Sequence, residues 1–227
     1  MDDSQIETAL AAAEEAVAAG SSLSGTGFWS AVAAVKREPS QIARFGDRIA
    51  AIDQAAFSNW ALIAVPLGVG TALMVAGTAA GLALIWWAYY LTGLGASIVF
   101  LLGTGVLMTT THGLAHLVVG RLAGISFTAW FIGSWLQPQP GVKVDYRTYL
   151  ATPPAKRAWM HASGAITTKL LPFALIGAAA ASGAQGWVTV ALLVIGVATI
   201  VTDFLWSTNA SDWSRFRREM GFTQPSV

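Results

Sequence analysis

Two histidines stand four residues apart in an apolar stretch with the order Thr109-Thr110-Thr111-His112-Gly113-Leu114-Ala115-His116. Residues i and i+4 lie on one face of an α-helix, so both imidazoles can bind the same metal ion. No charged residue occurs between Asp53 and Arg121, and ionisable side chains within a bilayer are so costly that they usually mark a functional site. The pair therefore predicts an intramembrane metal site.

The other ligands of such a site must come from few residue types. The chain has no cysteine, so Cys-ligated clusters and thiolate nucleophiles are excluded, and any further ligand is a His or a carboxylate. His161 stands beside Lys156 and Arg157 and is expected at the membrane interface rather than at the metal. Two other interpretations of His112 and His116 stay open. Each could hydrogen-bond a neighbouring helix, or one could be the axial ligand of a haem or a chlorophyll-type pigment.

Depth in the membrane favours Asp203 as a third ligand. Asp203 lies twelve residues before Arg215, whereas His112 lies nine residues before Arg121, so a continuous helix would bring Asp203 level with the His pair. A carboxylate at the end of an uncharged, apolar run is costly in a membrane and therefore usually marks a functional site. Lys169, which precedes that run, is the alternative partner, because it could form an ion pair with Asp203 or extend toward the interface.

The composition is that of a polytopic membrane protein. Hydrophobic residues make up 55% of the 227 residues and charged residues only 11%, against roughly 25% in soluble domains. The net charge of +1 and the lack of a long basic run exclude nucleic acid as a partner. Stretches of about 20 apolar residues cross a bilayer, and the sequence predicts an all-α fold with four such spans. They run from Asn59 to Tyr90, from Leu94 to Val119, from Ala158 to Ala181 and from Trp187 to Trp206.

The segments around the spans complete the predicted organisation. Residues 1–57 form an amphipathic N-terminal region, and its first 20 residues are expected to be a weakly amphipathic surface helix or a partly disordered tail. Residues 58–218 hold the membrane core, and residues 219–227 form a C-terminal tail. Between the second and third spans, Ile125 to Tyr149 partly alternates in polarity, which predicts a small β-hairpin at the membrane surface.

Basic residues set the expected orientation. Lys and Arg that flank short loops stay in the cytoplasm. They cluster before the first span (Lys36 to Arg48), between the second and third (Arg121 to Arg157) and after the fourth (Arg215 to Arg218). The other two loops, near Gly93 and from Ser182 to Gly186, are uncharged. Both termini and the central loop are therefore expected in the cytoplasm of a protein integral to the cell membrane and its lipid bilayer.

Three blocks of sequence within Thr109 to Arg218 form a further pattern. The first is His112-Gly-Leu-Ala-His116-Leu-Val-Val-Gly-Arg121-Leu-Ala-Gly-Ile125, followed by Phe127 to Gly133. The second is Pro153 to Thr168, and the third is Ser211-Asp212-Trp213-Ser214-Arg215. Their order and content resemble the site-2 protease family of intramembrane zinc metalloproteases. In that family an H-E-x-x-H helix with a basic end and a Gly-Ile step is followed by a strand, a helix with A-G-P-x-x-N, and L-D-G-x-R.

The resemblance implies a site-2-protease-like core with zinc held by His112, His116 and Asp212, the Asp of the third block. Asp212 would reach the His pair only if the chain leaves its helix after Trp206, which Ser207-Thr208-Asn209 permits. Otherwise Asp212 would cap a basic C-terminal helix. The choice between Asp212, from the resemblance, and Asp203, from depth, stays open.

The resemblance also implies a substrate, which would be a membrane-embedded peptide or a membrane protein partner. The strand that begins near Ile125 and Phe127 would pair with an extended substrate, as a form of strand addition, or would only cover the site. Thr168 takes the place of the family's Asn and is the third residue expected to face the substrate.

Gly113 is the main departure from the family. The Glu of H-E-x-x-H is the general base that takes a proton from water at the zinc, and Gly has no group that accepts a proton. Loss of a general base typically costs roughly 10²- to 10⁴-fold in rate. The sequence therefore predicts impaired proteolysis, with a role in binding membrane peptides or as an accessory subunit. Two alternatives stay open: an active metallopeptidase, with Gly113 introduced or another Asp as base, and a haem- or pigment-binding membrane subunit.

Overall fold

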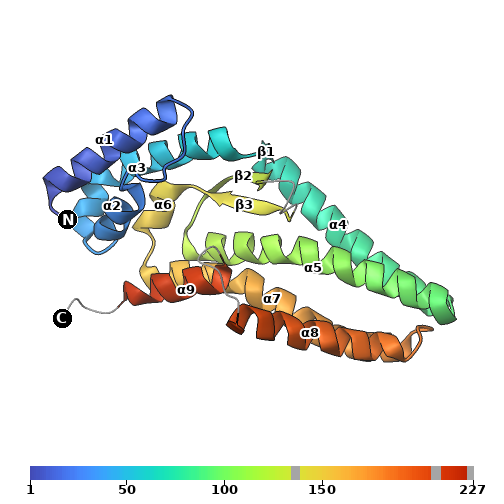
Figure 1. The fold of residues 1–227 in the computed structure, drawn as a ribbon. Coiled ribbons are helices and arrows are strands. Elements are labelled where there is room, and N and C mark those ends of the chain that lie inside the picture. Colours follow the sequence, from blue (N-terminus) through green and yellow to red (C-terminus); the bar gives the residue numbers. More distant parts are fainter. Residues whose placement is uncertain (134–138, 206–210, 224–227) are drawn as a thin grey trace.

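Helices make up most of the fold, and a small sheet lies between them (Figure 1). The structure, a computed structural model, describes residues 1–133, 139–205 and 211–223. In chain order the elements are α1 (Asp3–Ala18), α2 (Phe28–Val35), α3 (Pro39–Trp60), β1 (Ile63–Pro66), α4 (Leu67–Trp87), the 3-10 turn η1 (Ala88–Tyr90), α5 (Gly93–Ala123), β2 (Phe127–Ile132), β3 (Gly141–Val144), α6 (Tyr146–Ala151), α7 (Pro154–Ala181), α8 (Trp187–Leu205) and α9 (Asp212–Gly221).

The N-terminal helices form a packed unit. α1 begins with a capping box between Asp2 and Gln5, and its Ile6 and Leu10 are fully buried in a cluster shared with α2 and α3. The expectation of a surface helix is therefore correct, whereas that of a partly disordered tail is wrong. The apolar stripe of α1 is rich in Ala, which makes its amphipathic pattern weak but lets the helices pack closely. On its outer side, two Glu side chains pair with Arg48 of α3.

Three helices are long and apolar enough to cross a membrane. They are Leu67–Tyr90, formed by α4 and η1, Gly93–Ala123, which is α5, and Pro154–Ala181, which is α7. A shorter apolar helix, Trp187–Asp203, lies within α8 and coincides with the expected fourth span. The chain is thus a mostly helical protein of the integral-membrane type.

These four helices pack in the order in which they occur in the chain. α4 packs on α5, α5 on α7 and α7 on α8, so α4 and α8 lie at the outer sides of a row (Figure 1). Small residues permit close approach: a Cβ on Gly103 of α5 would lie 2.8 Å from the carbonyl oxygen of Gly81 in α4. The Gly93 amide donates to the Gly183 carbonyl at 3.0 Å. The α4–α5 turn and the α7–α8 turn therefore lie together at one end of the row.

The first apolar stretch does not form the single long span expected from Asn59 to Tyr90. α3 continues to Trp60, Ile63–Pro66 forms strand β1, and α4 begins only at Leu67. Hydropathy alone does not separate an apolar strand from the start of a span. Pro66 ends the strand because Pro lacks an N–H for the ladder and is tolerated only at strand ends and sheet edges.

The sheet is antiparallel and has the order β1-β2-β3. The expected hairpin is confirmed as β2 and β3, in which Phe127 pairs with Val144, and a bulge follows Phe127. β1 adds a strand that was not predicted, with Ile63 opposite Ile132. β2 is therefore the central strand, and both of its edges are already hydrogen-bonded.

Candidate metal centre

His112 and His116 lie one turn apart on α5, and their imidazoles converge. Their Nε2 atoms are 3.2 Å apart, and both side chains are largely buried, with 17% and 12% of their surface exposed. The hydroxyls of Thr110 and Thr111, just before His112, donate to carbonyl oxygens one turn earlier in the same helix. The two imidazoles are thus directed at one point beside α5, as the i, i+4 spacing predicts.

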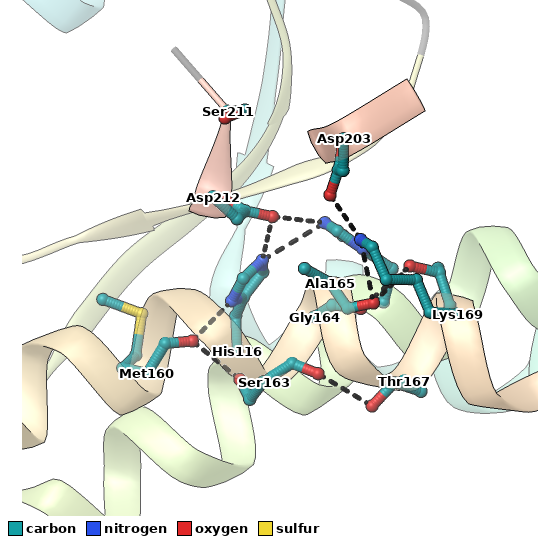
Figure 2. A network of polar contacts seen from close by, with 12 residues as sticks. His116, Met160, Ser163, Gly164, Ala165, Thr167, Lys169, Asp203, Ser211 and Asp212 are labelled. Atoms are coloured by element: carbon teal, nitrogen blue, oxygen red, sulfur yellow. Dashed lines mark hydrogen bonds and ion pairs between the residues drawn. The ribbon is translucent and has the colours of Figure 1, made fainter. Parts of the chain in front are cut away.

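Asp212 completes this group from the start of α9. Its Oδ2 atom lies 3.2 Å from Nε2 of His112 and 3.2 Å from Nε2 of His116. Figure 2 shows the carboxylate of Asp212 directed at His116. Ser211 caps α9, since its hydroxyl accepts a bond from the Ser214 amide at 3.2 Å, so the cap role considered for Asp212 falls to its neighbour.

The three donor atoms have the spacing that a small tetrahedral cation requires. Each pair is separated by 3.2 Å. Ligand atoms about 2.0–2.1 Å from a tetrahedral zinc ion lie about 3.3–3.4 Å from one another. Within the described part of the chain, these residues form a group of His and Asp side chains that could hold a metal ion. Two imidazoles and one carboxylate are also a donor set of catalytic zinc sites, which leave a fourth position open.

The backbone of α7 orients His116. The Nδ1 atom of His116 donates to the Met160 carbonyl at 2.7 Å (Figure 2). This bond assigns the proton to Nδ1 and leaves the lone pair of Nε2 for a metal, an arrangement common around metal-binding histidines. Nδ1 of His112 is buried and has no such partner among the described residues.

Gly164 of α7 allows this orientation. A Cβ on Gly164 would lie 2.3 Å from Nε2 of His116, a distance at which no side chain fits. The imidazole of His116 therefore packs directly against the backbone of α7.

The carboxylate of Asp212 is ionised. Burial raises its pKa, but the close contacts with the two imidazoles outweigh this effect and hold the pKa of Asp212 well below its usual range. An ionised carboxylate and two imidazole nitrogens directed at one point are a donor set that suits a divalent cation.

Asp203 lies elsewhere in the network. It forms an ion pair with Lys169, which joins α8 to α7 and is drawn in Figure 2. Lys169 also donates to the Ala165 carbonyl at 3.4 Å. Of the alternatives for Lys169, the structure shows the ion pair with Asp203, and of the two candidate Asp residues it brings Asp212 to the imidazoles. The unwinding expected at Ser207-Thr208-Asn209 falls outside the described residues.

Gly113 faces the sheet. A Cβ at this position would lie 2.5 Å from Cζ3 of Trp130 in β2. The indole is held from two further sides: its Nε1 donates to the Thr71 hydroxyl at 3.0 Å, and a Cβ on Gly70 of α4 would lie 2.4 Å from its Cγ. Trp130 thus fills the space into which a side chain at position 113 would extend.

Of the three residues expected to face substrate, Ile125 and Phe127 lie in the protein core, and Thr168 lies on α7 near the His pair. Ile125 and Phe127 are 1% and 6% exposed and belong to the core between α5, the sheet and α7. Phe127 packs against α5, since a Cβ on Gly120 would lie 2.4 Å from its Cζ. The Thr168 hydroxyl donates to the Gly164 carbonyl at 3.1 Å, which places Thr168 one turn beyond the glycine that contacts His116.

Sequence reasoning missed the residues that support the His pair. Met160 contributes its backbone carbonyl. Every residue has this group, so the residue type at position 160 does not predict the contact. Gly164 has a weak signal, because it lies within Ala162-Ser163-Gly164-Ala165, a run of small residues of the kind that lets membrane helices approach closely. His161 bonds the Tyr149 hydroxyl at 2.9 Å and lies outside the metal-binding group of described residues.

Comparisons with protein-family models, with curated proteins and with solved structures found no match. The geometry around His112, His116 and Asp212 is therefore the main guide to function.

Proposed function

We propose that this chain is a site-2-protease-like membrane protein that binds zinc through His112, His116 and Asp212. We propose further that it binds membrane-embedded peptides, or a membrane protein partner, with little or no cleavage. The observation that carries the proposal is the mutual 3.2 Å spacing of the three donor atoms, supplied by two of the three sequence blocks in which the resemblance was found.

The role of zinc in such a site would be that of a Lewis acid that polarises a peptide carbonyl or a water molecule. The residues of this chain hold the ion and orient its ligands: Asp212 neutralises charge, and the Met160 carbonyl fixes the tautomer of His116. Position 113 is a glycine, so it provides no proton acceptor. Asp203, the other carboxylate considered as a base, is paired with Lys169.

The same geometry disfavours the pigment-carrier alternative. A porphyrin ring lies perpendicular to the bond from its axial imidazole and needs a wide flat space. Around Nε2 of His116, that space holds Nε2 of His112 and the carboxylate of Asp212, each at 3.2 Å.

We also propose that α8 is a fourth span and that both termini and the segment 121–157 are cytoplasmic. α8 has 19 residues, about 29 Å at 1.5 Å per residue, which approaches the roughly 30 Å of a bilayer core. The contact between the α4–α5 turn and the α7–α8 turn supports this topology, because both uncharged turns then lie on the side opposite the Lys and Arg clusters.

The test is the metal content of purified protein that has been stripped and reloaded. We expect one zinc per chain, and His112→Ala, His116→Ala and Asp212→Ala should each lower zinc affinity by more than about 100-fold, since even changes outside the ligand shell cost roughly 10- to 100-fold. Asp203→Asn is the matched control and should keep the affinity. Absence of metal, preference for iron over zinc, or full affinity in a ligand variant would refute the zinc site.

The second part of the test uses fluorescent membrane-spanning peptides in lipid nanodiscs. We expect zinc-loaded protein to bind some of them without releasing fragments. Cleavage at the rate of an ordinary protease would show that another group serves as base and would overturn the proposed binding role.

A further inference from the structure

α9 supplies one metal ligand, and its far end is fixed by an unusual contact. The helix has ten residues, a length at which an isolated helix is marginal in water. Asp212 opens it, and Glu219 follows seven residues later, two turns along the same face. Glu219 is 1% exposed, although most of the helix around it is polar.

The carboxylate of Glu219 is held by two buried cations. Its Oε2 accepts from Nε of Arg157 in α7 at 2.7 Å, and its Oε1 accepts from Nζ of Lys36 at 2.5 Å. Arg157 is itself anchored, because its Nη1 donates to the carbonyl oxygens of Leu150 and Thr152 at 3.0 and 2.9 Å. Lys36 caps the end of α2, so the N-terminal unit takes part in the contact.

The carboxylate of Glu219 is ionised at neutral pH. Burial raises the pKa of Glu219, but the positive charges of Lys36 and Arg157 outweigh it and leave the pKa lowered. Removal of one partner from a buried ion pair is strongly destabilising, because the remaining charge has neither water nor a counter-ion. The contact therefore ties α9 to α7 and to the end of α2 at a defined position along and around its axis.

We propose that Glu219 is a positioning residue for the metal centre: through Arg157 and Lys36 it holds α9 where Asp212 meets the two imidazoles. Two turns of helix separate Glu219 from Asp212, about 10 Å. A tilt of about 10° around the Glu219 end would move Asp212 by roughly 2 Å, whereas metal–ligand distances tolerate about 0.2 Å. This role rests on the proposed zinc site, whose ligand Asp212 is held in place by the contact of Glu219 with Arg157 and Lys36.

The first experiment is a double-mutant cycle on metal affinity, read by competition with a chelator. Glu219→Gln, which keeps the shape and removes the charge, should lower zinc affinity by about tenfold or more. In an Asp212→Asn background the same change should have little further effect, since the anchor acts only through Asp212. Glu15→Gln, an exposed Glu on α1, is the control and should change nothing.

Replacement of zinc by cobalt gives a visible absorption band that reports the geometry of the metal ligands, and a general loss of stability does not change that geometry. Tetrahedral Co²⁺ absorbs strongly in the visible range, and Glu219→Gln should weaken this band at saturating metal while the helical content stays the same. If Glu219→Gln does not fold, Lys36→Met, which leaves the Arg157 pair in place, tests the same contact and should lower affinity by a smaller factor. An equal loss of affinity with and without Asp212, or no loss in either variant, would overturn the proposal.

A metal-independent measurement separates failure of this inference from failure of the zinc site. Because the chain has no cysteine, spin labels can be placed at Leu122→Cys, on an exposed side chain of α5, and at Gly221→Cys, where a Cβ would meet nothing within 4 Å. We expect a narrow distance distribution that broadens in Glu219→Gln. If the parent protein binds no metal, the proposed function fails while this result still decides the role of Glu219. An unchanged distribution contradicts that role.

Discussion

Gly113 and Trp130 fit each other: a Cβ at position 113 would lie 2.5 Å from Cζ3 and 2.8 Å from Cη2 of the indole. Rotation of the ring away from position 113 is unfavourable, because the ring packs against Gly70 and donates a hydrogen bond to Thr71 of α4. Position 113, where the proposed family resemblance would place a general base, is therefore not an empty place beside the His pair. Its space is occupied by a tryptophan.

We expect Gly113→Glu alone to leave peptide cleavage undetectable. The new side chain must displace Trp130, and such overpacking costs about 1–3 kcal/mol. Gly113→Glu combined with Trp130→Leu should raise cleavage of a membrane peptide by about 10²-fold or more, measured by fragment release. Gly105→Ala, on the same helix where a Cβ meets nothing within 4 Å, is the control for stability. Efficient cleavage by the single variant would show that Trp130 does not block the base.

Gly164→Ala should weaken metal binding without removing a ligand. Its Cβ would lie 2.3 Å from Nε2 of His116 and would push the imidazole away from the other two donor atoms. We expect a loss of about tenfold or more in zinc affinity. Gly177→Ala lies on the same helix with nothing within 4 Å and should have no effect. The explanation fails if Gly164→Ala binds zinc as tightly as the parent.

Lys36 should make stability depend on pH in the alkaline range. Burial lowers the pKa of Lys36 from 10.5 to about 8, although Glu219 acts in the opposite direction. Between these values the unfolded chain holds a proton that the folded chain has released, so this group makes the free energy of unfolding rise with pH. The slope is at most about 1.4 kcal/mol per pH unit.

Denaturant titrations in detergent between pH 7.5 and 10 measure this effect as the difference between the parent and Lys36→Met. The variant lacks the titrating group and should lack this part of the rise. Identical slopes in the two proteins would mean that Lys36 titrates near its ordinary pKa.

Reporter fusions test the proposed topology. A reporter at residue 145, within the central segment, and one after the last residue should both be active on the cytoplasmic side, whereas one inserted at residue 185 should be active on the opposite side. A central segment and a C-terminus on opposite sides would reduce the number of spans to three.

The His pair, the apolar helices and the Lys169–Asp203 pair could be predicted because each depends on local spacing or on a run of similar residues. The choice between Asp212 and Asp203 could not, because the depth argument assumed one continuous helix, whereas α8 ends at Leu205 and α9 begins at Asp212. β1 was missed because Ile63–Pro66 is as apolar as a membrane span. The filling of the space at Gly113 depends on Trp130, Gly70 and Thr71, which lie far apart in sequence.

The separation of the metal ligands along the chain also has a consequence for biosynthesis. His116 and Asp212 are 96 residues apart, and all of α7 and α8 lies between them. At about 5–20 residues per second, the ribosome adds Asp212 roughly 5–20 s after His116. During that interval the emerging chain holds the two imidazoles of the proposed site without its carboxylate. Under the proposed function, zinc would be captured firmly only after α9 has docked, so metal occupancy would report that the chain has folded past α8.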